Sequence, residues 1–243
     1  MYTLKYKTEL HCHTGDVSNC GKETAEYIVS RYIEAGYTSL VVANHMSYYT
    51  FVGSRNKYPQ FLEKTGKTDC WQSKVDFFMT GYENLVKAAD GKLNIILGME
   101  FRDFDPKVEN DYLVFGVTEE WLRASEKISE MNIKEMSAYV HESGMLIFQA
   151  HPFRNGMSVI NPKYLDGVEV FNGHFGHASR NKIAVAWADM YGLKRSSGTD
   201  FHEACHIPCG GILTDFPITT GEELLEVLKN ENYELLTDYE LSP

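Results

Sequence analysis

Short apolar runs alternate with amphipathic stretches along almost the whole chain, and this alternation limits the fold more than any other feature of the sequence. The runs that are typical of buried strands are 3–13, 39–43, 93–97, 111–117, 145–149, 167–171 and 194–197. Helical spacing of apolar residues covers 22–35, 72–89, 178–191 and 221–230, with two further helical stretches between 119 and 143. Strands that alternate with helices favour an α/β fold with a parallel sheet.

The sequence predicts a single domain over residues 1–243. A barrel of alternating strands and helices commonly fills about this length, and polar residues fall at the strand ends, which favours a parallel barrel over an open sheet. Residues 46–70 interrupt the alternation of strands and helices, because they are polar and aromatic and contain glycines and a proline. We interpret this segment as a long loop that forms a lid or specificity insertion over a site.

The charge balance limits the partners that the chain can have. A formal net charge of −11 argues against nucleic acid, whose phosphates are bound by clustered Lys and Arg. A small phosphorylated substrate remains compatible if bound cations reverse the local field. The first ten residues contain Lys5, Lys7 and Glu9 and form no apolar run, and no run elsewhere is long enough to span a membrane. The five cysteines are scattered, as in reducing compartments, so we expect a cytoplasmic protein.

Side chains that bind metals follow five of the predicted strands. They are His11 and His13, His45, Glu100, His151, and Asp200 with His202. The carboxyl ends of the strands of a barrel meet at one face, so we expect these seven side chains to share a pocket. A single histidine at a strand end is usually a surface residue, but seven such residues at the ends of five strands rarely arise by chance.

The local spacing agrees with a metal site. His11 and His13 are two residues apart on a strand and therefore point to the same side, and Asp200 and His202 are predicted to repeat this arrangement. Five imidazoles and two carboxylates suit Zn²⁺, Mn²⁺ or Fe²⁺. Seven ligands exceed the needs of one ion, so the sequence predicts at least two ions that share a bridging carboxylate.

These segments resemble the PHP (polymerase and histidinol phosphatase) superfamily over nearly the whole chain. The matching segments are LHCHT (10–14), VVANH (41–45), LGMEF (97–101), FQAHPFR (148–154), VEVFNG (168–173) and SGTDFH (197–202). The resemblance implies a distorted, TIM-like barrel of seven βα units with two or three metal ions, and phosphatase or phosphodiesterase activity. It also implies the ligands of each ion. The first ion would take His11, His13, Glu100 and Asp200, the second Glu100 and His151, and the third His45 and His202.

The chain departs from this family at two places. The family usually has an Asp or His five or six residues beyond the His-x-His pair as a ligand of the third ion. Here Asp16, Asn19 and Cys20 are the candidates for that ligand. The residue before His45 is usually acidic in the family, whereas here it is Asn44, a neutral amide in place of a carboxylate that would orient a ligand.

The predicted reaction is hydrolysis of a phosphate ester by a metal-activated water. We expect Arg154 to hold the phosphate, because a guanidinium binds oxyanions through two hydrogen bonds, although a surface arginine is an equal alternative. Asp200 or His202 would protonate the leaving oxygen or position the water. For His174, His177 and Arg180, which follow a strand end, a solvated loop position is favoured over a role in substrate binding.

Three classes of function remain open. A small phosphorylated metabolite or nucleotide is the first candidate substrate, with histidinol phosphate as a specific alternative, because the spacing from His13 to His45 resembles that branch of the family. An amidohydrolase-like enzyme acting on a substrate without phosphate is the second, but no strand end carries a lysine that could bridge two ions. A metal-binding module without activity is the third, and the nearly complete ligand set argues against it.

Overall fold

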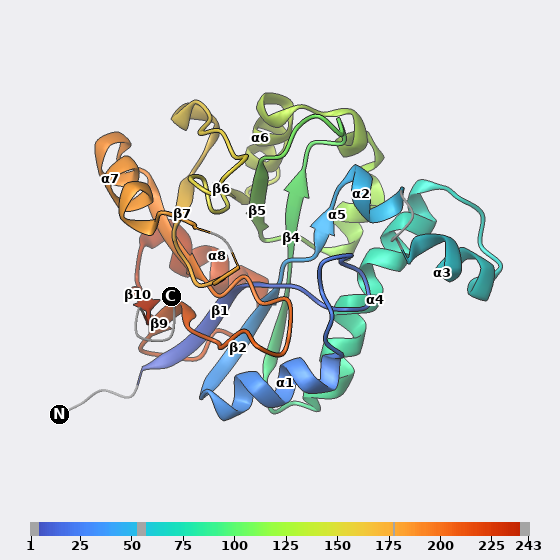
Figure 1. Ribbon diagram of the computed structural model, residues 1–243, viewed down its shortest axis with the longest axis horizontal. Coiled ribbons are helices and arrows are strands. Elements are labelled where there is room, and N and C mark those ends of the chain that lie inside the picture. Colours follow the sequence, from blue (N-terminus) through green and yellow to red (C-terminus); the bar gives the residue numbers. More distant parts are fainter. Residues whose placement is uncertain (1–4, 53–56, 177, 239–243) are drawn as a thin grey trace.

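The computed structural model describes residues 5–52, 57–176 and 178–238, and one mixed sheet forms their centre (Figure 1). Its strands are β1 (Tyr6–Cys12), β2 (Tyr37–Val42), β3 (His45–Met46), β4 (Asn94–Arg102), β5 (Asp111–Phe115), β6 (Leu146–Gln149), β7 (Gly167–Asn172), β8 (Lys194–Gly198), β9 (Gly210–Thr214) and β10 (Glu234–Thr237). The order across the sheet is β10-β9-β1-β2-β4-β5-β6-β7-β8, and β3 pairs with β4. Glu100 therefore lies inside β4 and not beyond it, because this strand continues to Arg102.

Helices follow most of the strands and pack around the sheet. They are α1 (Ala25–Glu34), α2 (Tyr48–Phe51), α3 (Tyr58–Thr65), α4 (Trp71–Ala89), α5 (Glu119–Ala124), α6 (Ile133–Glu142), α7 (Asn181–Tyr191) and α8 (Gly221–Asn230), with short 3-10 helices η1 (Glu126–Glu130) and η2 (Pro162–Tyr164). Helices α1 and α4 contact each other beside β2 and β4, and α7 packs on β7 (Figure 1). Helix α1 begins three residues later than predicted, because the hydroxyl of Thr24 accepts the Tyr27 N–H and caps the first turn.

The chain beyond β8 returns to β1 and nearly closes the sheet into a barrel. Cys12 and Phe201 form a parallel bridge. Beside it, the His13 N–H donates to the Phe201 carbonyl at 3.0 Å and the Phe201 N–H donates to the His11 carbonyl at 3.3 Å. The predicted distorted, TIM-like barrel is confirmed, and the carboxyl ends of its parallel strands meet at one mouth.

The barrel is not wholly parallel, which corrects the prediction. Strand β5 is antiparallel to both β4 and β6, and β9 is antiparallel to β1 and β10. Parallel neighbours need a crossover of about a dozen residues or more, usually through a helix. Residues 103–110, which join β4 to β5, are too few for such a crossover and contain no helix, so the chain turns back as a hairpin. Strands β9 and β10 are additions that the sequence analysis did not predict.

The segment 46–70 is not the long loop that the sequence predicts. It contains α2 and α3, while residues 53–56 lie outside the described part of the chain. Phe51 and Tyr58 are buried, and their rings lie 6.4 Å and 5.5 Å from that of Phe77 in α4. Most of the aromatic residues of this segment therefore hold it against the barrel.

The opposite end of the barrel from the mouth is apolar. Three residues of α8, Leu224, Val227 and Leu228, pack in one buried cluster with residues of β1, β2, β4 and β5. Buried apolar residues also lie next to the predicted ligands, among them Leu10, Cys12 and Phe201, so the core extends up to the mouth. No helix in the described part of the chain is long and apolar enough to cross a membrane.

Candidate metal centre

The seven side chains that the sequence predicts as metal ligands converge on one small volume at the barrel mouth, with Glu100 at its centre. Glu100 Oε1 lies 3.4 Å from His11 Nε2 and 3.2 Å from His151 Nε2. Glu100 Oε2 lies 3.2 Å from His13 Nε2 and 2.9 Å from His45 Nδ1. One carboxylate is therefore surrounded by four imidazoles that come from three different segments of the chain: β1 and its end, β3, and the residues after β6.

Asp200 is the second carboxylate of the same cluster. Its Oδ1 lies 3.3 Å from the Nε2 atoms of both His11 and His13, and also 3.3 Å from His202 Nδ1. Water has little access to the two carboxylates and their neighbouring imidazoles, because four of these side chains are at most 1% exposed: His11, His13, Glu100 and Asp200. Their role as ligands stays a prediction, but the structure brings all of them together.

The surroundings of the two Glu100 oxygens indicate whether a cation fits this cluster. Both are buried, and neither meets hydrogen-bond geometry with any group in the described residues. An ionised carboxylate without hydrogen bonds is costly to bury unless a cation stands beside it. Imidazole nitrogens and carboxylate oxygens are the donors that zinc, manganese and iron accept. The donor set therefore fits a divalent metal centre.

Two of the imidazoles are held in the tautomer that binds metals. His11 Nδ1 lies 2.9 Å from Glu169 Oε1, and a carboxylate oxygen accepts, so His11 Nδ1 carries the hydrogen. His202 Nδ1 lies 2.8 Å from the carbonyl oxygen of Asp200, which can only accept. The lone pair of each ring is therefore on Nε2. A hydrogen bond from the other ring nitrogen is how metal-binding histidines are usually oriented.

Asn44 orients a third imidazole through a serine. Its Oδ1 accepts hydrogen bonds from the Thr14 N–H at 2.8 Å and from the Ser18 hydroxyl at 3.0 Å. Because Ser18 donates to Asn44, its oxygen is free to accept from His13 Nδ1, which lies 3.2 Å away. The neutral amide at this position thus positions His13 by hydrogen bonding, and no acidic residue is required here.

The backbone bends sharply at two of the seven positions. His151 and Asp200 have φ angles of 28° and 55°, in the left-handed region that side chains other than glycine rarely adopt. Asp200 and His202 reach the same cluster, as predicted, but through this bend beyond β8 and not through the strand geometry of His11 and His13. The bend at His151 is held by its N–H, which donates to Glu169 Oε2 at 2.9 Å. Such strained residues are typical of functional sites.

The acidic and basic groups of the cluster shift one another's pKa values toward their charged forms. Burial lowers the pKa of His11, but the negative charges of Asp200, Glu169 and Glu100 raise it well above its usual value. Burial likewise opposes a charge on His202, yet Asp200 and Cys20 raise its pKa to about 9. Burial would raise the pKa of Glu100, and the neighbouring imidazoles instead hold it well below its usual value. Positive charge beside these carboxylates is strongly favoured.

Glu169 and Asn172 belong to the site, and the sequence analysis did not identify them. Besides its two histidine contacts, Glu169 accepts from Asn172 Nδ2 at 2.9 Å, and the same amide group donates to Asp200 Oδ2 at 3.1 Å. Both residues lie in β7 and are at most 2% exposed. An acidic residue inside the apolar run 167–171 is the signal that could have identified Glu169, since buried carboxylates need partners.

A pocket of about 260 Å³ opens beside the cluster. The residues that line it are Asn19, Cys20, His45, Ser47, Tyr49, Thr50, Arg102, Arg154 and His202. Ser47, Tyr49 and Thr50 belong to the segment 46–70, so the start of this segment borders the pocket as a specificity insertion would. Asp200 is not among the lining residues, whereas His202 is.

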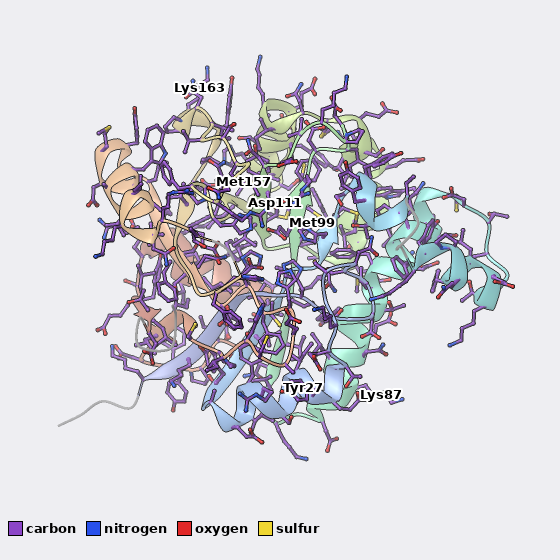
Figure 2. The ribbon with its side chains drawn as sticks, in the orientation of Figure 1. Tyr27, Lys87, Met99, Asp111, Met157 and Lys163 are labelled. Atoms are coloured by element: carbon purple, nitrogen blue, oxygen red, sulfur yellow. The ribbon has the colours of Figure 1, made fainter. Side chains whose placement is uncertain are left out.

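Two arginines of the pocket share one buried aspartate. Arg102 binds Asp111 through two hydrogen bonds, Nε to Oδ1 at 2.5 Å and Nη2 to Oδ2 at 2.6 Å. Arg154 makes one longer contact, 3.3 Å, to Asp111 Oδ2. Asp111 is fully buried and lies toward the middle of the view in Figure 2, whereas Lys163 projects at the edge. Arg102 was missed by the sequence analysis, although its position two residues beyond Glu100 on the same strand places both on one face.

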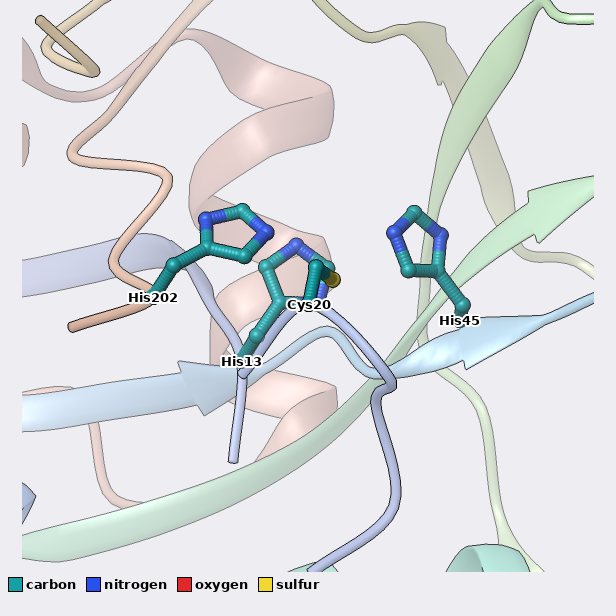
Figure 3. Close-up of side chains that lie close together, drawn as sticks. All are labelled: His13, Cys20, His45 and His202. Atoms are coloured by element: carbon teal, nitrogen blue, oxygen red, sulfur yellow. The ribbon is translucent and has the colours of Figure 1, made fainter. Parts of the chain in front are cut away.

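The three candidates for the ligand of a third ion have different surroundings. Asp16 is hydrogen-bonded to Asn84, and burial raises the pKa of its carboxyl group. Asn19 Nδ2 donates to the Tyr49 carbonyl at 2.7 Å. Only Cys20 is gathered with imidazoles of the predicted ligands (Figure 3).

His174 and His206 lie beside His202 but have the opposite tautomer. The Gly176 N–H donates to His174 Nδ1 at 2.9 Å, and the His202 N–H donates to His206 Nδ1 at 3.0 Å. A backbone N–H can only donate, so in a neutral ring Nε2 carries the hydrogen and has no lone pair for a metal. Arg180 binds the Phe153 carbonyl at 2.6 Å outside the pocket, and His177 lies outside the described residues.

Comparisons with known proteins find likeness in structure only. No family model matches the sequence, and no curated protein matches it. A two-domain protein of Bacteroides vulgatus, described as containing a predicted PHP-like metal-dependent phosphoesterase, superposes with a TM-score of 0.62 at 15% identity. The alignment covers 96% of this chain and 65% of that one, so this chain spans less than two thirds of its length.

Two further structures are similar. A putative metal-dependent phosphoesterase of Bifidobacterium adolescentis has a TM-score of 0.52 at 15% identity, with 92% of this chain and 96% of that chain covered. PsfC of Pseudomonas syringae has a TM-score of 0.59 at 12% identity, with 91% and 88% covered. At such low identity the likeness concerns the fold, and the chain therefore shares the fold of the PHP-like metal-dependent phosphoesterases.

Proposed function

We propose that this protein hydrolyses the phosphate ester of a small metabolite or nucleotide, using two or three divalent ions of zinc, manganese or iron. The observation that carries the proposal is the position of Glu100. Its two buried oxygens face four imidazoles and have no hydrogen bonds among the described groups, next to a pocket with two arginines. A carboxylate that faces ligands on both sides is suited to bridge two cations.

The charge of the pocket supports an anionic substrate. The chain as a whole has a formal net charge of −11, so an anion is repelled unless the site itself is positive. Arg102 and Arg154 share only one carboxylate, that of Asp111, which leaves one positive charge in excess. Arg154 makes the weaker of the two contacts and borders the pocket, so it is the better placed to bind phosphoryl oxygens.

Bound divalent ions would supply Lewis acidity and would lower the pKa of a water molecule near the phosphorus. The residues of the chain would provide the rest. Arg154 would orient the phosphoryl group, and Glu169 and Ser18 would keep the rings of His11 and His13 in place. Of the two predicted proton carriers, only His202 borders the pocket, which favours His202 over Asp200 as the group that reaches the substrate.

The related folds support the same class of reaction. Two of the similar structures are described as metal-dependent phosphoesterases or as containing one, and both share this barrel. The pocket volume of about 260 Å³ suits a small substrate, so histidinol phosphate and mononucleotides belong in the first substrate panel.

A hydrolysis screen with matched substrates tests the proposal. The purified protein is loaded with Mn²⁺, Zn²⁺ or Fe²⁺ and assayed on phosphomonoesters, phosphodiesters, and amides or lactones of similar size. We expect turnover of phosphate esters only. Arg154→Ala should raise KM by at least about tenfold with metal content unchanged, since one charge-assisted contact is worth about 1.5–3 kcal/mol.

Arg31→Ala, a change on the outer helix α1, is the control. An unchanged KM in Arg154→Ala would remove Arg154 from the substrate site. Hydrolysis of amides or lactones without hydrolysis of phosphate esters would replace the proposal by an amidohydrolase-like activity.

A further inference from the structure

A second cluster of ligand-type side chains lies beside Glu100, and it contains a thiol. Cys20, His13, His45 and His202 each offer one ligand atom, and these atoms all lie within 4.8 Å of one another. Figure 3 shows the four side chains gathered at the barrel mouth. They come from the end of β1, the loop that follows it, β3, and the chain beyond β8, so their meeting is a product of the fold.

His13 is already committed to the cluster around Glu100. Its Nε2 faces Glu100 and Asp200 at 3.2 Å and 3.3 Å, and its Nδ1 contacts Ser18. Both ring nitrogens of His13 are thus engaged, whereas His45 faces Glu100 through Nδ1 and keeps Nε2 for a second partner, so the remaining set is Cys20, His45 and His202. The ring of His202 offers its Nε2 lone pair, because its Nδ1–H is bound to a carbonyl oxygen.

The loop that carries Cys20 is held in place from both sides. The Lys22 N–H donates to the His202 carbonyl at 2.8 Å, and the Gly15 N–H donates to the Glu23 carbonyl at 2.9 Å. A Cβ atom on Gly21 would lie 2.5 Å from the Thr14 carbonyl oxygen, so only glycine allows the chain to pass there. The residue next to Cys20 is thus fixed against the site, and the thiol is presented to the two imidazoles.

The thiol has no competing structural role in the described part of the chain. The five cysteines are all free there, and Cys20 is an exposed residue, unlike the buried Cys12 and Cys209. A free, exposed thiol at a mouth lined by imidazoles is available for coordination. His45 and His202 are also partly accessible, with side-chain exposures of 19% and 13%.

We propose that Cys20, His45 and His202 form a thiolate–imidazole site for a third ion, which differs in chemistry from the nitrogen and oxygen ligands around Glu100. Thiolate selects thiophilic ions such as Zn²⁺ or Fe²⁺ over Mn²⁺ and Mg²⁺. Three protein ligands with an open position are typical of catalytic zinc sites. All three residues border the pocket, so the open position faces the substrate. The site stands independently of the reaction that the protein catalyses.

Cobalt substitution tests the thiolate directly, without an activity assay. Co²⁺ bound to a thiolate has a sulfur-to-metal charge-transfer band in the near ultraviolet, which nitrogen and oxygen ligands do not produce. We expect this band in the Co²⁺-loaded parent protein and its loss in Cys20→Ser. Elemental analysis of the zinc-loaded proteins should show about one equivalent less in Cys20→Ser, with the ions around Glu100 retained.

Cys70→Ser and Cys205→Ser are the matched controls, because both thiols are exposed and neither belongs to this group. Cys205 is gathered with Glu203 and His206 instead, so its variant also tests whether that group produces the band. Both variants should keep the band, and the melting temperatures of all three should match that of the parent within a few degrees. A band that persists in Cys20→Ser, a band that depends on Cys205, or a fully loaded parent without a band would each overturn the proposal.

Discussion

The hydrogen-bond partner of each imidazole decides what that side chain can bind. Where the partner of Nδ1 accepts, as for His11 and His202, the lone pair is on Nε2 and points into the cluster. Where the partner is a backbone N–H, as for His206, Nδ1 accepts and Nε2 carries the hydrogen of the neutral ring, so Nε2 has no lone pair for a metal. Residue type alone therefore predicts too many metal ligands. A hydrogen bond from Nδ1 to Glu169 or to a carbonyl oxygen indicates which of the imidazoles can bind a metal through Nε2.

Glu100 is the residue on which the metal centre depends most. In Glu100→Gln the side-chain size is kept, but the negative charge between the imidazoles is lost. We expect kcat to fall by at least about a hundredfold, on the scale of a removed catalytic element, with the fold preserved. Bound metal should fall with it, because the amide cannot offset the charge of two cations.

Measurements of kcat, bound metal and melting temperature beside the parent decide this prediction. Glu63→Gln, at an exposed position in α3, is the control and should change none of them. Near-normal turnover of Glu100→Gln with two ions still bound would contradict the bridging role.

At the scale of elements, one buried carboxylate joins the strands that close the barrel. Glu9 in β1 accepts hydrogen bonds from the backbone N–H groups of Leu10, His11 and Thr199, at 2.9–3.0 Å. It also accepts from the hydroxyls of Tyr32 in α1 and of Thr199, just beyond β8. Glu9 therefore ties together the two segments that carry His11, His13, Asp200 and His202, four of the predicted metal ligands.

The titration of Glu9 should make stability depend on pH. Burial raises the pKa of Glu9 from 4.5 to about 7, although the hydrogen bonds from Thr199, His11 and Tyr32 oppose the shift. A raised pKa in the folded state means that the contribution of Glu9 is fully present below pH 4.5 and is lost as the pH rises through 7. The shift corresponds to about 3 kcal/mol, at roughly 1.4 kcal/mol per pKa unit.

Denaturant unfolding of the parent and of Glu9→Gln between pH 4.5 and 8 measures this effect. Glutamine does not titrate, so the stability of the parent relative to the variant should decline across this range by about 3 kcal/mol. A pH-independent difference would mean that Glu9 is ionised in the folded protein throughout, with its five donors outweighing its burial.

At the scale of the whole molecule, an acidic chain holds a cluster of buried imidazoles and carboxylates at one end and an apolar core at the other. The folded chain brings the predicted ligands together and the unfolded chain does not, so metal binding and folding should be linked. We predict at least two transition-metal ions per chain in protein purified without chelator. Chelation should lower the melting temperature, and restored metal should raise it again, since ions that bind only the folded state stabilise it.

Elemental analysis and melting curves before and after chelation check this expectation. Less than about one equivalent of all transition metals together, with a melting temperature that does not respond to added metal, would count against a resident metal centre. His141→Asn, which removes an exposed imidazole far from the mouth, serves as the control for nonspecific binding.

The sequence by itself determined the ligand types and the strands that carry them, because both depend on local properties. An apolar run of β-branched residues forms a strand wherever it is buried, and a histidine at its carboxyl end is carried to the mouth of a barrel. The seven clustered residues and the barrel were predictable for this reason. The helices of the segment 46–70 and the antiparallel direction of β5 were not predictable in this way. The helices depend on packing against α4, and the direction of β5 depends on the short connection 103–110.

Only the tertiary structure decided which partners complete the site. Glu169 orients His11 from 158 positions away, and Arg154 meets Asp111 across 43. Contacts over such separations depend on how the strands are ordered and bent, which no local pattern records. The same holds for Cys20, whose thiol meets the imidazoles of His13, His45 and His202 only because the fold brings three other segments of the chain to it.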